Sequence, residues 1–247
     1  MPDIQVADDG PIRTIRMNRP DKKNALTLAM YDAMAEAIEQ AGSSGVRCLL
    51  IAGSPGAYCA GNDIGDFVTM AQGGALGAPI LRFLYALARS ETPLVAAVSG
   101  AAVGVGTTML LHCDYVVAAS DSKLSTPFVA LGLVPEAASS LIAARLMGHA
   151  RAFSLLVMGQ PLSAEEAKAA GIVNSIVPPD ELETAARAAA EKIAALPPEG
   201  VRVARRLMRG APDEIVARID EEAEAFKQRL TSPDAQAAFM AFLSRKR

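Results

Sequence analysis

The sequence has no tryptophan and is poor in the other aromatic residues, in cysteine and in histidine. Of its 247 residues, 4% are aromatic, three are cysteine and two are histidine. Cys48, Cys59 and Cys113 are odd in number and stand in apolar contexts, which is typical of reduced, mostly buried thiols. His112 and His149 do not combine with them in a zinc-type spacing, so we expect no metal site.

The chain also has little net charge and no long hydrophobic run. A net charge of −3 argues against a general surface for nucleic acid or anionic membranes. No apolar run reaches the roughly 18 residues that a membrane-spanning helix needs. Residues 1–10 lack the basic and then apolar pattern of an export signal, so we expect a cytoplasmic protein.

Hydrophobic residues make up 51% of the chain, which favours a fully folded protein with a large core. Its length fits one large α/β domain or two small ones. Strands alternate with helices up to about residue 177, and the rest of the chain is predicted to be helical, which indicates an α/β core with a trailing helical region. The helical stretches expected from hydrophobic periodicity and capping residues are 27–41, 136–147, 150–158, 180–196, 199–208, 213–230 and 233 onward.

The most informative stretch joins a buried strand to a glycine-rich turn. Leu94–Val98 is continuously apolar, as expected of a strand that is covered on both faces. Gly100, Gly104 and Gly106 follow, and a helix is expected to open near Val105. Free N–H groups and the positive helix end would then point into the turn, where a phosphate, a carboxylate or a transient oxyanion could bind.

A second loop, residues 53–64, leaves another buried strand in the same way. Because the carboxyl ends of parallel strands meet in one crevice, Ala60–Gly61 and Val105–Gly106 could aim two N–H groups at one oxygen. Such a pair stabilises negative charge on a carbonyl. The alternative is that both are ordinary strand–helix turns. A dinucleotide-binding fingerprint is disfavoured, since no third glycine stands at the expected position after Gly106.

A carbonyl activated in this way loses an α-proton more readily, so a carboxylate should lie nearby. Glu136 is the favoured candidate, because it stands at an expected helix start among small and apolar residues that would raise its pKa, although the helix end opposes that rise. The alternative is that Glu136 only complements the helix dipole. The other acidic residues near these loops are Asp63, Asp66, Asp114 and Asp121.

Five segments, found in this order, resemble the crotonase (enoyl-CoA hydratase/isomerase) superfamily over nearly the whole chain: residues 18–26, 58–64, 98–114, 126–136 and 167–174. The resemblance implies an α/β fold with a crotonase-like ββα spiral core over residues 1–195. It also implies a C-terminal helical trimerisation region over residues 196–247, and a homotrimer or dimer of trimers. The implied substrates are acyl-CoA thioesters, with no cofactor apart from the coenzyme A of the substrate.

The resemblance also implies roles for single residues. The N–H groups of Ala60 and Val105 would form an oxyanion hole, with valine at 105 in place of the usual glycine. Glu136 would be the catalytic base. Which basic residues hold the CoA phosphates is left open. The residues implied to line the CoA groove are Lys22, Ala25, Leu26, Ala60, Gly61, Asn62, Asp63 and Ile64.

The two glutamates of the family's hydratases fall at Thr108 and Phe128 of this chain. Addition of water needs one group to activate the water and another to deliver a proton, and neither residue can act as a base near neutral pH. The segments around residues 58 and 136 instead look like the peroxisomal-type Δ3,Δ2-enoyl-CoA isomerases, in which one glutamate at the Glu136 position moves a proton between the α and γ carbons. The alternatives are an enoyl-CoA hydratase of fatty-acid β-oxidation, a thioester hydrolase and a non-catalytic acyl-CoA-binding relative.

Overall fold

The computed structural model describes residues 1–54, 56–63, 65–66 and 77–244. Its strands form a six-stranded sheet in the order β1-β2-β3-β5-β7-β10 and a four-stranded sheet in the order β4-β6-β8-β9. The pairs β3/β4, β5/β6 and β7/β8 each supply one strand to the first sheet and the next strand to the second. This repetition is the expected spiral, and the α/β fold class is confirmed.

The strands have the following bounds. They are β1 Ile4–Asp9, β2 Ile12–Met17, β3 Cys48–Ala52, β4 Ala57–Cys59, β5 Leu94–Val98, β6 Ala101–Val103, β7 Tyr115–Ala119, β8 Lys123–Ser125, β9 Leu162–Ser163 and β10 Ser175–Val177. The described helices are α1 Leu28–Glu39, α3 Ala78–Arg89, α4 Val105–Thr108, α5 Ser139–Met147, α6 His149–Leu156, α7 Ala164–Ala169, α8 Leu182–Ala194, α9 Pro198–Arg209, α10 Pro212–Leu230 and α11 Pro233–Ser244.

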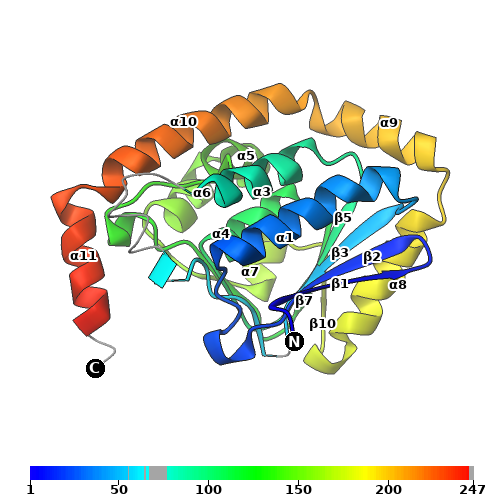
Figure 1. Cartoon of the computed structure of the whole chain (residues 1–247), viewed down its shortest axis with the longest axis horizontal. Coiled ribbons are helices and arrows are strands. Elements are labelled where there is room, and N and C mark those ends of the chain that lie inside the picture. The colour runs from blue at the N-terminus through cyan, green and yellow to red at the C-terminus, as the bar shows by residue number, and fades with distance from the viewer. Residues whose placement is uncertain (55, 64, 67–76, 245–247) are drawn as a thin grey trace.

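The six-stranded sheet is covered on both faces, which explains the continuous apolar runs of β3 and β5. On one face α8 packs with Ala186, Ala190 and Ala194, whose spacing of four places them on one side of the helix. On the other face the core contains residues of α1 and α3, including the edge-to-face pair Tyr31 and Phe83. Figure 1 shows α1 and α8 on opposite sides of these strands.

The alternation of apolar and polar residues predicts a hairpin of strands 4–6 and 12–17 around a turn at residues 7–11. In the structure the strands are longer, because residues 7–9 continue β1 and pair with β2 up to Asp9 opposite Ile12. Arg13 stabilises this extension, because its guanidinium donates two hydrogen bonds to the Asp8 carboxylate at 2.7 and 2.8 Å. Gly10, with φ of +57°, then makes the tight turn that remains.

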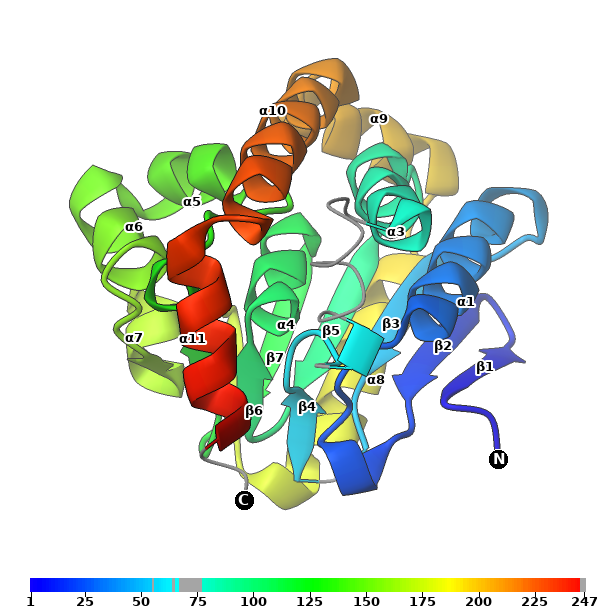
Figure 2. The same cartoon turned by 60° about the vertical axis from the view of Figure 1, so that its left-hand side comes forward.

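The C-terminal helices fold back over the core. Figures 1 and 2 show α9 and α10 crossing one side of the molecule, with α11 descending in front of the smaller sheet. Phe226 and Leu230 of α10 join the main core. Gly132 lies so close to α11 that a Cβ there would come within 2.6 Å of the Ala235 nitrogen. The boundary at residue 195 and the trimerisation role of these helices stay predictions.

Two further features concern membranes and metals. Among the described helices, none is long and apolar enough to cross a membrane. Within the same part of the chain, no group of three or more His, Cys, Asp and Glu side chains could hold a metal ion.

Candidate active site

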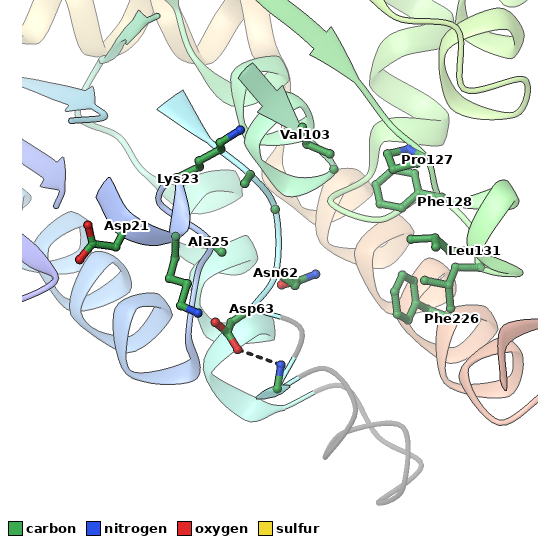
Figure 3. A pocket seen from close by; sticks show the side chains of 16 residues that line it. Asp21, Lys23, Ala25, Asn62, Asp63, Val103, Pro127, Phe128, Leu131 and Phe226 are labelled. Atoms are coloured by element: carbon green, nitrogen blue, oxygen red, sulfur yellow. Dashed lines mark hydrogen bonds between the residues drawn. The ribbon is translucent and has the colours of Figure 1, made fainter. Parts of the chain in front are cut away.

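A pocket of about 620 Å³ opens where the loops after β4 and β6 meet the C-terminal helices. Figure 3 shows its two sides: Asn62 and Asp63 face Phe128, Leu131 and Phe226 across the opening. The residues that line it are Asp21, Lys22, Lys23, Ala25, Ala60, Gly61, Asn62, Asp63, Gly65, Val103, Gly104, Pro127, Phe128, Leu131, Leu133 and Phe226.

Most of the residues expected to line a CoA groove do line this pocket. Lys22, Ala25 and residues 60–63 are all at its surface. Leu26 does not line it, because its side chain is 1% exposed and belongs to the core. Ile64 lies outside the described residues. That these residues bind CoA remains a prediction.

The pocket floor is formed by two main-chain segments that pair with each other. The Leu26 N–H donates to the Gly61 carbonyl and the Asp63 N–H donates to the Leu26 carbonyl, both at 2.8 Å. Asn24, which is fully buried with φ of +56°, anchors the pairing. Its amide group donates to the Ala57 and Tyr58 carbonyls at 2.8 and 3.1 Å. Sequence analysis missed Asn24, although asparagine is among the few residues that tolerate this conformation.

This pairing corrects one of the expected oxyanion donors. The Ala60 N–H already donates to the Lys23 carbonyl at 2.9 Å, so it is not free to bind a substrate oxygen. The Asn62 N–H and the Val105 N–H have no acceptor within the described part of the chain. Their loops touch, because a Cβ on Gly61 would lie 3.1 Å from the Val103 carbonyl oxygen. Amides without an acceptor in the described part of the chain therefore stand in both adjoining loops, at Asn62 in one and at Val105 and Gly106 in the other.

Four of the five candidate carboxylates accept hydrogen bonds from main-chain amides or form ion pairs with arginine. Asp66 accepts a hydrogen bond from the Leu28 N–H at the start of α1, and Asp121 accepts one from Gly100. Asp114 pairs with Arg205 at 2.8 Å and accepts from the Leu94 N–H. Burial raises the pKa of Asp63, but the 2.7 Å ion pair with Arg19 and hydrogen bonds from the Gly65 and Asp66 amides together lower it. These four carboxylates have structural roles.

Glu136 differs from them in burial and in partner. Its side chain is 6% exposed, and its carboxyl accepts a hydrogen bond from the Thr108 hydroxyl of α4. The pKa of Glu136 is raised to about 8, mainly by burial. The hydrogen bond from Thr108 opposes this rise, and the charge of Glu222 adds to it. Thr108 stands three residues after Val105 in α4, so the carboxyl is tied to the helix that carries one free amide.

The expected helix start at Glu136 is wrong. Ala137 and Ala138 have φ values of +62° and +54°, and α5 begins only at Ser139. The first amides of α5 bind Glu222 instead of Glu136: the Ala138 N–H donates to it at 2.6 Å and the Ser140 N–H at 2.9 Å. The helix end therefore does not oppose the rise of the Glu136 pKa in the way the sequence indicated.

Glu136 is not one of the residues that line the pocket, but it lies close to the Asn62 loop. Burial is the main cause of the raised pKa values of Tyr31 and Cys59, and the charge of Glu136 adds to both. Cys59 precedes that loop, and the Tyr31 hydroxyl donates to the Asn62 side-chain oxygen at 2.5 Å. The carboxyl thus lies behind the pocket surface, near both loops.

The apolar side of the pocket comes from segments far apart in the chain. Phe128 and Leu131 follow β8, whereas Phe226 belongs to α10. Sequence analysis missed Phe226, and no local signal could reveal it, since its periodicity only indicates a helix that buries one face. It also missed Lys23, a cation at the pocket.

Two of the basic residues that could have held the CoA phosphates are already engaged. Arg205 and Arg229 donate to carbonyl and carboxylate groups of this chain.

Comparisons with known proteins show the family to which the chain belongs. Residues 8–247 match the family described as enoyl-CoA hydratase/isomerase. The chain is 36% identical over 250 residues to enoyl-CoA delta isomerase 2 of Rattus norvegicus, covering 98% of this chain and 64% of that protein. It therefore spans less than two thirds of that relative.

Solved structures extend the agreement to the fold. The structure of Pseudomonas aeruginosa OdaA is 43% identical with a TM-score of 0.92, covering 98% of each chain. An enoyl-CoA hydratase/isomerase from Pseudoalteromonas atlantica T6c is 36% identical with a TM-score of 0.93, covering 99% of this chain and 98% of the other. On the family match, the shared fold and the pocket between the two loops, this chain belongs to the enoyl-CoA hydratase/isomerase family.

Proposed function

We propose that this protein is an enoyl-CoA isomerase that converts a 3-enoyl-CoA into the 2-enoyl-CoA. The observation that carries the proposal is that the buried carboxyl of Glu136 accepts a hydrogen bond from Thr108. Thr108 stands where the family's hydratases have one of their two glutamates. Phe128 stands at the position of the second hydratase glutamate and lies in the apolar wall of the pocket. One carboxyl suffices to move a proton, whereas addition of water needs two suitable groups.

The thioester oxygen would accept hydrogen bonds from the Asn62 and Val105 main-chain amides, with Asn62 replacing Ala60 as the donor. Ionised Glu136 takes a proton from C2, and the electrons of that C–H bond pass into the conjugated enolate. The two amides stabilise the negative charge that develops on the oxygen. Glu136 then returns the proton to C4, which leaves the double bond between C2 and C3. No cofactor beyond the coenzyme A of the substrate takes part.

The raised pKa of Glu136 suits a group that both takes and gives a proton. A base whose pKa lies near the working pH returns its proton readily and is still partly ionised. The hydrogen bond from the Thr108 hydroxyl favours the ionised form and holds one oxygen in place. Burial supplies the opposing effect, which keeps the carboxyl from being fully ionised at neutral pH.

The two sides of the pocket match the two ends of an acyl-CoA. Lys22 and Lys23 line one side and would attract the CoA phosphates. Phe128, Leu131 and Phe226 line the other and would contact apolar parts of the thioester. The negative net charge of the chain makes such a local concentration of lysines necessary for binding a polyanion.

The test is turnover of 3-enoyl-CoA by the wild-type chain and by Glu136→Gln. The substitution keeps the shape but removes the base, so kcat should fall at least about 100-fold. Near-wild-type turnover by Glu136→Gln would refute the mechanism. Hydration of 2-enoyl-CoA by the wild type at ordinary enzymatic rates would favour a hydratase, and tight CoA binding without turnover would favour a non-catalytic relative.

We also propose that the chain assembles as a homotrimer or a dimer of trimers. Leu207 and Met208 near the end of α9 are 77% and 87% exposed, and apolar residues so exposed are suited to burial between subunits. Light scattering should give three or six times the 25.7 kDa chain mass. Leu207→Lys should lower this mass if α9 lies in the interface, and a monomeric wild type would exclude the assembly.

A further inference from the structure

The turn that follows Glu136 is held by a carboxylate from the other end of the chain. Glu222 of α10 accepts hydrogen bonds from the Ala138 N–H at 2.6 Å and from the Ser140 N–H at 2.9 Å. The Ser140 hydroxyl donates to the same carboxylate. Glu222 is 6% exposed, so these bonds are shielded from water. A buried carboxylate that accepts hydrogen bonds from several N–H and O–H groups fixes both the position and the orientation of its partners.

The turn requires such a restraint. Ala137 and Ala138 both have positive φ, a conformation that is unfavourable for alanine and persists only where the surroundings impose it. His112 Nε2 lies 2.7 Å from the Ala137 carbonyl oxygen and, since a carbonyl only accepts, is the donor. His112 therefore holds the carbonyl of the turn, while Glu222 holds the amides that follow it.

Glu136 immediately precedes this turn, so the direction of its side chain depends on the same restraint. Its carboxyl meets the Thr108 hydroxyl in a chain that reverses directly afterwards, at residues 137 and 138. A helix begun at Glu136, as the alanine-rich sequence favours, would turn the side chain away from its present place. A displacement of about 1 Å at a reacting group can lower turnover by about 100-fold.

We propose that Glu222 is a positioning residue, which from α10 fixes the turn at Ala137–Ala138 and thereby holds the Glu136 carboxyl against Thr108. The proposal rests on the proposed function of Glu136 as the base. Glu222 does not line the pocket and is not a catalytic residue. It acts through the main chain between residues 138 and 140.

The charged and titratable groups around Glu136 define a second readout. Thr108 of α4, Tyr31 of α1, Cys59 of β4 and Glu222 of α10 are the described groups that interact with it. Burial raises the pKa of Glu222, against hydrogen bonds from Ser140 and Ala138 and the charge of Arg218, which lower it. Loss of the Glu222 charge would lower the pKa of Glu136, whereas release of its carboxyl from Thr108 would raise it. The titration of Glu136 therefore reports positioning in a variant that keeps Glu222.

The experiment compares Glu222→Gln with Glu224→Gln, a matched control on the same helix whose side chain is 61% exposed and pairs with Lys227. In Glu222→Gln the side-chain NH2 group would face one of these N–H donors and could not accept its hydrogen bond, which loosens the turn. We therefore expect kcat to fall at least about tenfold while KM changes less than about threefold. Glu224→Gln should match the wild type in both quantities.

A second variant keeps the test decisive if Glu222→Gln does not fold. Ser140→Ala removes one of the three donors and leaves the main chain intact, so kcat should fall about threefold with KM unchanged. A folded Glu222→Gln, or in its absence a folded Ser140→Ala, with wild-type kcat would overturn the proposal. A loss that appears only in KM would do the same, because positioning of the base acts on the chemical step.

Failure of the proposed function can be told apart from failure of this inference. A wild type without isomerase turnover refutes the function. The inference is then decided by nuclear magnetic resonance of glutamate labelled with carbon-13 at the carboxyl, with the Glu136 signal assigned by Glu136→Gln. Ser140→Ala loosens the turn but keeps the Glu222 charge, so it should shift the Glu136 titration to higher pH as the Thr108 hydrogen bond weakens. An unchanged titration would overturn the inference without any assay of activity.

Discussion

The two halves of the candidate site are fixed in different ways. The Asn62 half is built from neighbouring main chain, because residues 23–26 pair with residues 60–63 and Asn24 anchors both. The Glu136 half is held by side chains that come from elsewhere, namely Thr108, His112 and Glu222. Main-chain pairing tolerates many side chains, whereas a turn held by single residues depends on each of them. Substitutions should therefore act differently on the two halves.

The largest effect is expected where the two strand-end loops touch. A Cβ on Gly106 would lie 2.7 Å from the Cys59 carbonyl oxygen, so Gly106→Ala must push the loops apart. We expect kcat to fall by about 100-fold, since the loss of one aligned oxyanion donor costs that much. Gly42→Ala is the control, because its Cβ would meet nothing within 4 Å. Equal kcat values for the two variants would contradict the assignment of Val105 as a donor.

The next effect concerns stability of the main-chain half. Asn24→Ala removes the amide that binds the Ala57 and Tyr58 carbonyls and the oxygen that accepts from Arg19 N–H and Ser54. Buried groups left unpaired cost about 1–3 kcal/mol each, so the free energy of unfolding should fall by about 2–4 kcal/mol. Urea unfolding measures it, with Gln40→Ala as an exposed control. A loss below about 1 kcal/mol would show that Asn24 does not anchor the loops.

A smaller effect tests the side-chain half. Thr108→Val removes the hydrogen bond that lowers the pKa of Glu136, so the pH midpoint of kcat/KM should move to higher pH. Activity at pH 7 should fall about three- to tenfold, because less of the base is ionised. Thr108→Ser keeps the hydroxyl and should restore the wild-type midpoint. Ser140→Ala, which loosens the turn that holds the same hydrogen bond, should shift the midpoint in the same direction, and opposite shifts of the two variants would contradict the assigned roles.

The smallest effect is on the pH dependence of stability. Because the pKa of Glu136 is raised from 4.5 to about 8, the folded chain keeps a proton that the unfolded chain loses, and the free energy of unfolding falls as pH rises between these values. Glu136→Gln removes this dependence. Its Tm should exceed that of the wild type at pH 8 by at least about 2 °C and by less at pH 5. An equal difference at both pH values would contradict the raised pKa.

Sequence reasoning succeeded where one local pattern decides the structure. The apolar runs of β3 and β5 and the periodicity of α8 to α11 gave those elements nearly to the residue, and Thr27 caps α1 as expected. The spiral came from the family resemblance. The glycine-rich strand ends indicated the two loops and the small and apolar neighbours indicated Glu136, while the resemblance supplied the roles expected of them.

It failed where a distant residue decides a local conformation. The alanines after Glu136 favour a helix, but Glu222, 84 residues after Ala138, holds them in a turn. Likewise, composition cannot show which amide of the loop at residues 60–62 is free, because this depends on the pairing with residues 23–26. The sequence therefore indicated Ala60, whose N–H the Lys23 carbonyl occupies.

Glu222 and Phe226 stand one helical turn apart on α10, so a single helix face reaches both the turn at residues 137–138 and the pocket wall. The ribosome makes α10 after every strand of both sheets. With Glu222 in the role proposed here, a nascent chain can complete its β-structure while its proton-transferring group is still unplaced. Activity would then switch on only as the last helices dock, so a half-made chain could not process thioesters before its binding cleft is finished.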